Sequence, residues 1–140
     1  VLALGATVVT NERSITADDF FEGMFETALN EDEIITEIKF PIPEKASYIK
    51  FPNPASRYAM VGVFMVKKPE GISVAVTGAG ENGVFRCQEI ENVLNSNFAL
   101  EALDNIQISH DNLTSDIHAS AAYRANLIKE MAKKGLQELI

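Results

Sequence analysis

The sequence contains a single cysteine, Cys87, and no tryptophan. One cysteine excludes an internal disulfide, so we expect a small buried residue in a reducing compartment and a cytoplasmic location. Long apolar runs are missing too, since none approaches the roughly 18 residues of a membrane-spanning helix. The sequence also lacks the Cys-x-x-Cys and His-Glu-x-x-His patterns, and it therefore predicts no metal site.

Basic residues are scarce relative to acidic ones. The chain has 12 lysines and arginines against 20 aspartates and glutamates, which gives a net charge of −8. The imbalance is concentrated in residues 11–40, where nine acidic residues face only Arg13 and Lys39. Such a surface repels phosphate backbones, so the charge pattern argues against nucleic-acid binding.

The length of 140 residues suits one ordinary domain, and 46% hydrophobic with 23% charged residues is typical of globular proteins. The first residues, V-L-A-L-G-A-T-V-V-T, read as a strand and lack an initiator methionine, a basic segment and a cleavage site. We therefore expect the chain to be part of a longer polypeptide.

Three runs rich in β-branched and aromatic residues dominate the middle of the chain. They span residues 47–51, 58–67 and 72–77 and are separated by Pro52-Asn53-Pro54 and by Lys68-Pro69-Glu70-Gly71. Short breaks of this kind predict a three-stranded antiparallel meander, with the apolar second run in the centre and covered on both faces. Gly78-Ala79-Gly80 is interpreted as a turn that ends the third strand, because Glu81 would oppose a phosphate.

The flanking segments complete an α+β fold class. Before the meander we expect a short helix over residues 18–24, capped by Thr16, and a strand over residues 31–42. After it, a three-helix bundle is expected from residues 88–94, 98–103 and 119–140. On the long last helix, an apolar stripe includes Tyr123, Leu127 and Met131, whereas the polar face carries Arg124, Lys129, Lys133 and Lys134.

Two groups of polar residues are candidates for function. Lys50 and Arg57 flank the double-proline loop, where they either meet an anion or an electron-rich ring, or are simply solvated. His110 and His118 could bind a metal with Asp111 or Asp116, but Asp116 and His118 are better suited to hydrogen bonds with the backbone where the last helix begins. No catalytic set is evident from the residues.

Several linked motifs resemble one family. K-F-P-N-P-A-S-R-Y-A-M-V-G-V (Lys50 to Val63) and S-D-I-H-A-S-A-A-Y-R-A-N-L (Ser115 to Leu127) are similar to the flavoprotein, or medium, subunit of the molybdenum hydroxylases. Carbon monoxide dehydrogenase and xanthine dehydrogenase belong to this family. A-V-T-G-A-G (Ala75 to Gly80) and the segment from Ala17 to Pro41 also match, so the resemblance covers nearly the whole chain.

The resemblance implies a division into two domains. Residues 1–30 would be the tail of an FAD-binding domain whose glycine-rich phosphate loops lie upstream, and residues 31–140 the C-terminal domain. Family members place this domain against the flavin, and by the same resemblance the contacts would come from Ile34 or Ile35, Lys50 and Arg57. The implied partners are an iron–sulfur small subunit and a large subunit that holds the molybdenum cofactor.

The leading hypothesis is therefore an accessory domain of an oxidoreductase subunit that packs on FAD and on partner subunits during electron transfer. The chain alone is then not expected to be catalytic. An autonomous interaction domain without a cofactor is the alternative from another functional class. An independent small-molecule enzyme is the third hypothesis, and the missing catalytic set disfavours it.

Overall fold

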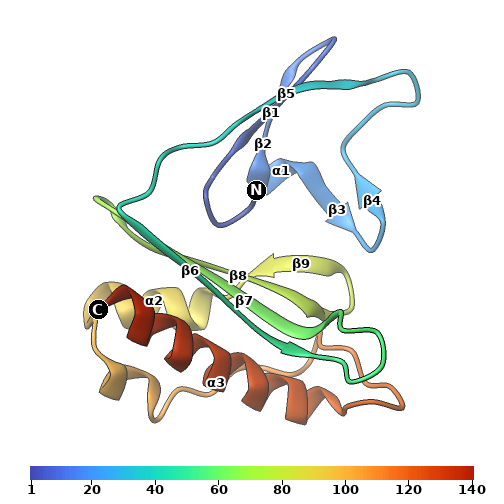
Figure 1. The fold of residues 1–140 in the computed structure, drawn as a ribbon. Helices are drawn as coiled ribbons and strands as arrows, with labels where there is room; N and C mark the ends of the chain where they lie inside the picture. The colour runs from blue at the N-terminus through green and yellow to red at the C-terminus, as the bar shows by residue number, and fades with distance from the viewer.

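The computed structural model describes all 140 residues, which form two packed units (Figure 1). Residues 1–44 make up the N-terminal unit, in blue and cyan, and residues 45–140 the meander domain below it. The elements of the N-terminal unit are β1 (Thr7–Thr10), β2 (Ser14–Thr16), α1 (Ala17–Phe20), β3 (Phe21–Gly23), β4 (Glu26–Thr27) and β5 (Ile35–Lys39). Those of the meander domain are β6 (Lys45–Pro52), β7 (Ala59–Lys68), β8 (Gly71–Gly80), β9 (Gly83–Arg86), α2 (Gln88–Ser96), the 3₁₀ helix η1 (Leu100–Leu103) and α3 (Ala121–Leu139).

The meander domain is built on a four-stranded antiparallel sheet in the order β6-β7-β8-β9. The three expected strands are present, but the prediction of three strands was wrong because it missed β9. Glu81 and Asn82 form a two-residue turn that pairs Gly80 with Gly83. Gly78-Ala79-Gly80 therefore belongs to β8 instead of to a turn, and the left-handed φ of +78° at Gly78 marks an irregularity inside the strand.

One face of the sheet is covered by the helices. The alternating residues Val61, Val63 and Met65 of β7 point into a core shared with α2, η1 and α3, and all three are buried. From α3, that core receives Leu127, Ile128, Met131, Ala132, Leu136 and Leu139. In place of the expected three-helix bundle, the cover consists of two α-helices and one turn of 3₁₀ helix.

The opposite face of the sheet is covered by the N-terminal unit. Val66 of β7 and Ala75 of β8 pack with Leu2, Ala3 and Ala17 in a second buried cluster. β7 is thus central and covered on both faces, as its apolar sequence predicted. Arg86 of β9 adds a polar link, since its guanidinium lies 3.6 Å from the carboxylate of Asp18.

Two predictions for the N-terminal unit were only partly right. Thr16 caps a helix as expected, accepting a hydrogen bond from the backbone N–H of Asp19 at 3.3 Å, but that helix ends at Phe20. Ala17 and Phe20 of this helix are buried, while Phe25 is fully exposed in the turn between β3 and β4. The strand expected over residues 31–42 is the shorter β5, which pairs with β1 and is exposed along its whole length.

Glu33 holds the segment that leads into β5. Its buried carboxylate accepts hydrogen bonds from the Thr10 hydroxyl at 2.6 Å, the Arg13 guanidinium at 2.9 Å and the Asn30 backbone N–H at 2.9 Å. These donors favour the charged form and lower the pKa of Glu33 to about 2, the hydrogen bond from Arg13 contributing most. Glu33 thus connects residues 10–13 with residues 30–34 through hydrogen bonds that its ionised form accepts best.

The structure contains no helix that combines the length and the hydrophobicity of a membrane span.

Replacement of Leu127 by Ala should destabilise the protein by about 2–5 kcal/mol, because it leaves a cavity between α3 and the sheet. Thermal unfolding of the purified variant provides the measurement. Gln137→Ala on the exposed face of the same helix is the matched control, and it should change stability by no more than about 0.5 kcal/mol. A melting temperature for Leu127→Ala within 2 °C of wild type would contradict the packing of α3 described above.

Glu33 should make the stability depend on pH in the acid range. Because its folded pKa lies below the unfolded value, its contribution is complete above about pH 4.5 and is lost as the pH falls toward 2. We expect Glu33→Gln to be less stable than wild type at pH 7 and the difference to shrink between pH 4.5 and 2. Urea unfolding at several pH values measures this, and a difference that stays constant with pH would contradict it.

Candidate functional site

An open hollow that joins two of the predicted site residues lies at one end of the meander. Lys50 and Arg57 line a single open hollow of about 510 Å³ together with Tyr48, Ser56, Tyr58, Ala59, Thr77 and Gly78. The structure thus brings the two cations together, as their positions on either side of the double-proline loop suggested. They are the only charged residues in the lining, so the hollow suits an anionic or electron-rich group.

The position of Lys50 follows from the register of the sheet. Tyr48 and Lys50 are two residues apart on β6, so both side chains project from the face that the N-terminal unit covers elsewhere. Lys50 pairs with Gly62 of β7, and a side chain at Gly62 would lie within 2.6 Å of the Tyr48 hydroxyl and of the Thr77 hydroxyl. Because Gly62 has no side chain, the hydroxyls of Tyr48 and Thr77 can occupy this space.

The loop from Asn53 to Tyr58 holds Arg57 in a fixed conformation. Arg57 has a left-handed φ of +64°, which is unusual for a residue with a side chain. Its backbone N–H donates to the carbonyl of Asn53 at 2.9 Å, and its own carbonyl accepts from the Lys50 ammonium at 3.1 Å. Lys50 thus fixes the backbone of Arg57, and both charges are presented at the rim of the hollow.

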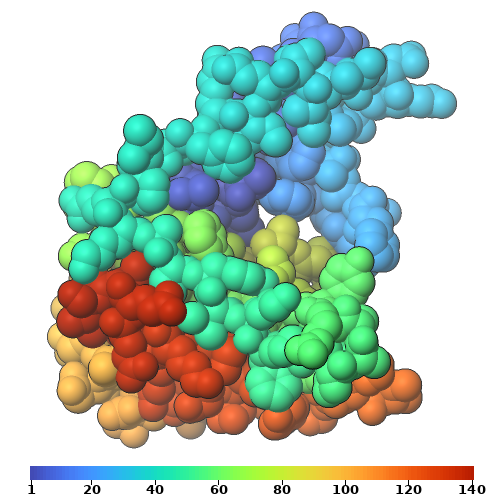
Figure 2. Space-filling view, in the orientation of Figure 1, coloured from blue at the N-terminus to red at the C-terminus, as the bar shows by residue number.

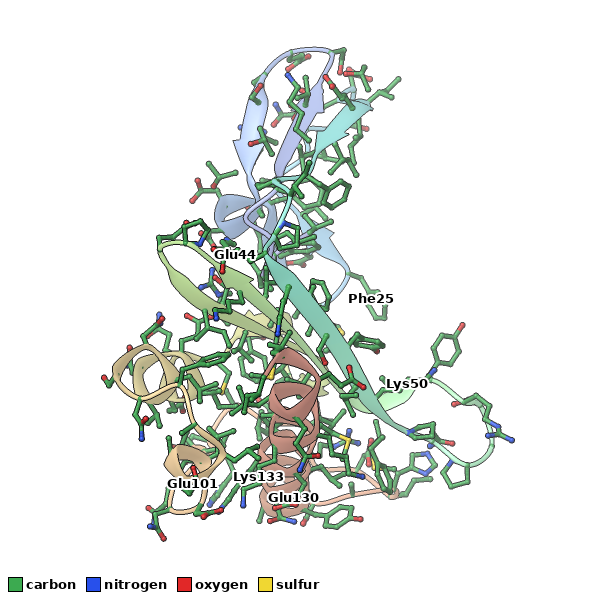
Figure 3. The ribbon with its side chains drawn as sticks, turned by 60° about the vertical axis from the view of Figure 1, so that its left-hand side comes forward. Phe25, Glu44, Lys50, Glu101, Glu130 and Lys133 are labelled. Carbon is green, nitrogen blue, oxygen red and sulfur yellow. The ribbon has the colours of Figure 1, made fainter.

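Phe25, an exposed aromatic residue of the N-terminal unit, lies on the same side of the molecule as Lys50 (Figure 3). Phe25, at the tip of the β3–β4 hairpin, has a left-handed φ of +63° and a fully exposed ring. In the space-filling view a small opening lies between the blue N-terminal unit and the yellow and green residues of the sheet, which touch on either side of it (Figure 2). The sequence pattern predicted that Phe25 would be an apolar contact of the short helix, and its full exposure shows that this prediction was wrong.

Arg124 was placed on the polar face of the last helix, and that prediction was wrong. Its side chain is 4% exposed and lies directly behind the hollow. The guanidinium donates to the carbonyl of Met60 at 2.7 Å, to the carbonyl of Gly78 at 3.1 Å and to the Asp116 carboxylate at 2.8 Å. A single arginine next to a tyrosine on a helix gives no sequence signal for such burial, because arginines are usually solvated.

Ile35 is the first residue of β5 and Ile34 directly precedes it, and neither lines the hollow. Ile34 is 68% exposed, and its backbone N–H donates to the Asn11 side chain at 2.8 Å. Both isoleucines therefore present apolar surface on the N-terminal unit, whereas Lys50 and Arg57 present charge on the meander domain.

The other polar candidates have structural partners. As predicted, the Asp116 carboxylate accepts from the backbone N–H groups of His118 at 2.9 Å and Ala119 at 3.0 Å, and these bonds lower its pKa. Nowhere do three or more His, Cys, Asp or Glu side chains gather in a group that could hold a metal. Cys87 is buried as expected, and burial raises the pKa of its thiol to about 12, which leaves it protonated and unreactive.

Comparison with known proteins finds a matching family model and several homologues. Residues 1–43 match the FAD binding domain in molybdopterin dehydrogenase. The chain is 31% identical, over 98% of its length, to the glyceraldehyde dehydrogenase medium chain of Sulfolobus acidocaldarius, of which the match covers 54%. It is 32% identical, over 99% of its length, to the nicotine 6-hydroxylase medium subunit of Paenarthrobacter nicotinovorans, of which the match covers 53%.

Solved structures support the same fold. Carbon monoxide dehydrogenase from Hydrogenophaga pseudoflava matches 98% of the chain with a TM-score of 0.76 at 23% identity, and 53% of that protein's chain is covered. Quinoline 2-oxidoreductase from Pseudomonas putida 86 matches 97% of the chain with a TM-score of 0.73 at 22% identity, and covers 52% of that chain. The chain spans about half the length of the curated relatives that it matches. The chain thus contains part of an FAD-binding domain of the molybdopterin dehydrogenase family, and its homologues are medium chains of molybdenum hydroxylases.

Proposed function

We propose that this chain is an accessory part of a flavoprotein subunit, which packs against FAD and partner subunits while electrons pass from iron–sulfur clusters to FAD. The observation that carries the proposal is the hollow in which Lys50 and Arg57 are the only charged residues. FAD, when bound, supplies the electron-carrying chemistry. Lys50 and Arg57 would orient the flavin ring and provide positive charge beside it.

The residues that line the hollow fit the flavin ring of FAD better than its pyrophosphate. Two cations and two tyrosines, Tyr48 and Tyr58, suit the polar edge of an electron-rich ring. The pyrophosphate needs several backbone N–H groups or cations, which glycine-rich loops at helix N-termini commonly supply. Gly78-Ala79-Gly80 lies inside a strand and does not serve this purpose. We infer that the phosphates are held by residues outside this chain.

The exposed apolar residues support contacts with the rest of such an assembly. Ile34 and Ile35 are proposed to touch the flavin from the N-terminal unit, opposite the two cations. Phe40 and Ile42, which follow the other end of β5, are 52% and 96% exposed, so apolar surface flanks the strand at both ends and is suited to being covered by protein. A large subunit with the molybdenum cofactor and a small iron–sulfur subunit are the proposed partners.

We also propose where the two domains divide. Since β5 pairs with β1, the N-terminal unit continues to about residue 43, where the match to the FAD-binding domain also ends. A division there, instead of after residue 30, keeps each sheet within one unit. The substrate is proposed to be chosen in another subunit, because medium chains with similar sequences carry names as different as glyceraldehyde dehydrogenase and nicotine 6-hydroxylase.

The chain alone should bind FAD only weakly. Lys50 and Arg57 could each contribute roughly 1.5–3 kcal/mol as charged donors, short of the roughly 8 kcal/mol behind micromolar affinity once association entropy is subtracted. The acidic segment 11–40 adds repulsion toward a dianion. Titration of the purified chain, followed by flavin fluorescence, should show no saturation below about 10 μM FAD. Tighter saturable binding would contradict the accessory role and indicate a self-sufficient flavin site.

In the complete subunit, Lys50→Met and Arg57→Met should each lower the midpoint potential of FAD. Reduction adds negative charge to the ring, and a nearby cation stabilises the reduced form. For a two-electron couple, each 1.4 kcal/mol lost corresponds to about 30 mV. Lys134→Met, which removes an exposed charge from α3, is the matched control and should leave the potential unchanged. Equal potentials in all variants would favour an interaction domain whose cations do not meet the flavin.

A further inference from the structure

The buried guanidinium of Arg124 occupies an energetically costly position. It lies in the first turn of α3, where the helix dipole disfavours a cation, and its Nε atom is buried without a hydrogen-bond partner. Burial of a charge costs several kcal/mol unless partners compensate for it. Asp116 and two backbone carbonyls provide that compensation, so the side chain is held in one geometry.

The carbonyls that Arg124 binds belong to the two strands that form the back of the hollow. The pairing of β7 with β8 extends only to Gly62 and Thr77, so Met60 and Gly78 lie beyond the last pair. Arg124 connects the two strands at the point where their ladder has ended. The backbones of β7 and β8 lie close together there, since a side chain at Gly78 would come within 2.2 Å of the Ala59 carbonyl oxygen.

Ala59 and Gly78 are themselves lining residues of the hollow, and Ala59 begins β7 directly after the loop that carries Arg57. A change in the spacing of the two carbonyls would therefore move the base of that loop. Asp116 is fixed in turn by the backbone N–H groups of His118 and Ala119 at the start of α3. Polar contacts thus connect the start of α3 with Met60 and Gly78, and the backbone leads from Met60 through Ala59 to the loop.

We propose that Arg124, held by Asp116, is a positioning residue that sets the placement of Arg57 and Lys50 toward the flavin. Arg124 does not reach the hollow, so it acts through the carbonyls of Met60 and Gly78. The inference rests on the proposed function, because it assigns a role at the same site.

The test uses the complete FAD-loaded subunit and compares Arg124→Met, Arg124→Lys and Asp116→Asn. Arg124→Met should shift the midpoint potential of FAD in the same direction as Arg57→Met, by at least a third as much, and weaken FAD binding at least threefold. Arg124→Lys should restore part of both effects, because an ammonium can bind some of the same acceptors. Asp116→Asn should shift the potential and the FAD affinity in the same direction. If Arg124→Met does not fold, the potential and FAD affinity of Asp116→Asn provide the test instead.

The matched control is Lys133→Met, which breaks the 2.7 Å ion pair with Asp104 near the other end of α3 and should leave the potential and FAD affinity at wild-type values. A lower melting temperature for Arg124→Met and Asp116→Asn, with unchanged potential and FAD affinity, would overturn the inference and make the contact purely structural. If Arg57→Met shifts the potential and Arg124→Met does not, only this inference fails. If neither shifts it, the proposed function fails as well.

Discussion

Burial of β7 and β8 on both faces is the constraint on which the rest of the structure depends. Their side chains alternate between a core shared with the helices and a smaller cluster shared with the N-terminal unit. Two different covers are therefore needed, and removal of either would expose apolar surface of the central strands. The N-terminal unit is in this sense part of the packing of the sheet, although its own two small sheets are separate from it.

The candidate site lies at the edge of the area that the N-terminal unit covers on the sheet. Near Lys50 and Gly62 the N-terminal unit no longer packs on the strands, and polar side chains replace the apolar cluster. Positive charge gathers here in a chain whose net charge is −8, with most of the excess acid in residues 11–40. This contrast would direct a negatively charged group toward the hollow instead of the N-terminal unit.

Strongly patterned segments were predictable from the sequence, and features set by single tertiary contacts were not. The run from Tyr58 to Lys67 identified a central strand because apolar residues fill both of its faces. β9 was missed since the four residues after the turn at Glu81 and Asn82 give too little pattern. The burial of Arg124 depends on carbonyls 46 and 64 residues away in sequence, which no local rule contains. Tyr123 was expected on the buried stripe but is 46% exposed beside Phe51.

The central claim is that the hollow at Lys50 and Arg57 faces the flavin. A crystal structure of the complete subunit with bound FAD tests it most directly. The account predicts that the ring of the flavin lies between the N-terminal unit and the meander domain, with Lys50 or Arg57 within hydrogen-bond distance of a ring oxygen or nitrogen. A flavin ring bound elsewhere, with the hollow filled by side chains of another subunit, would contradict it.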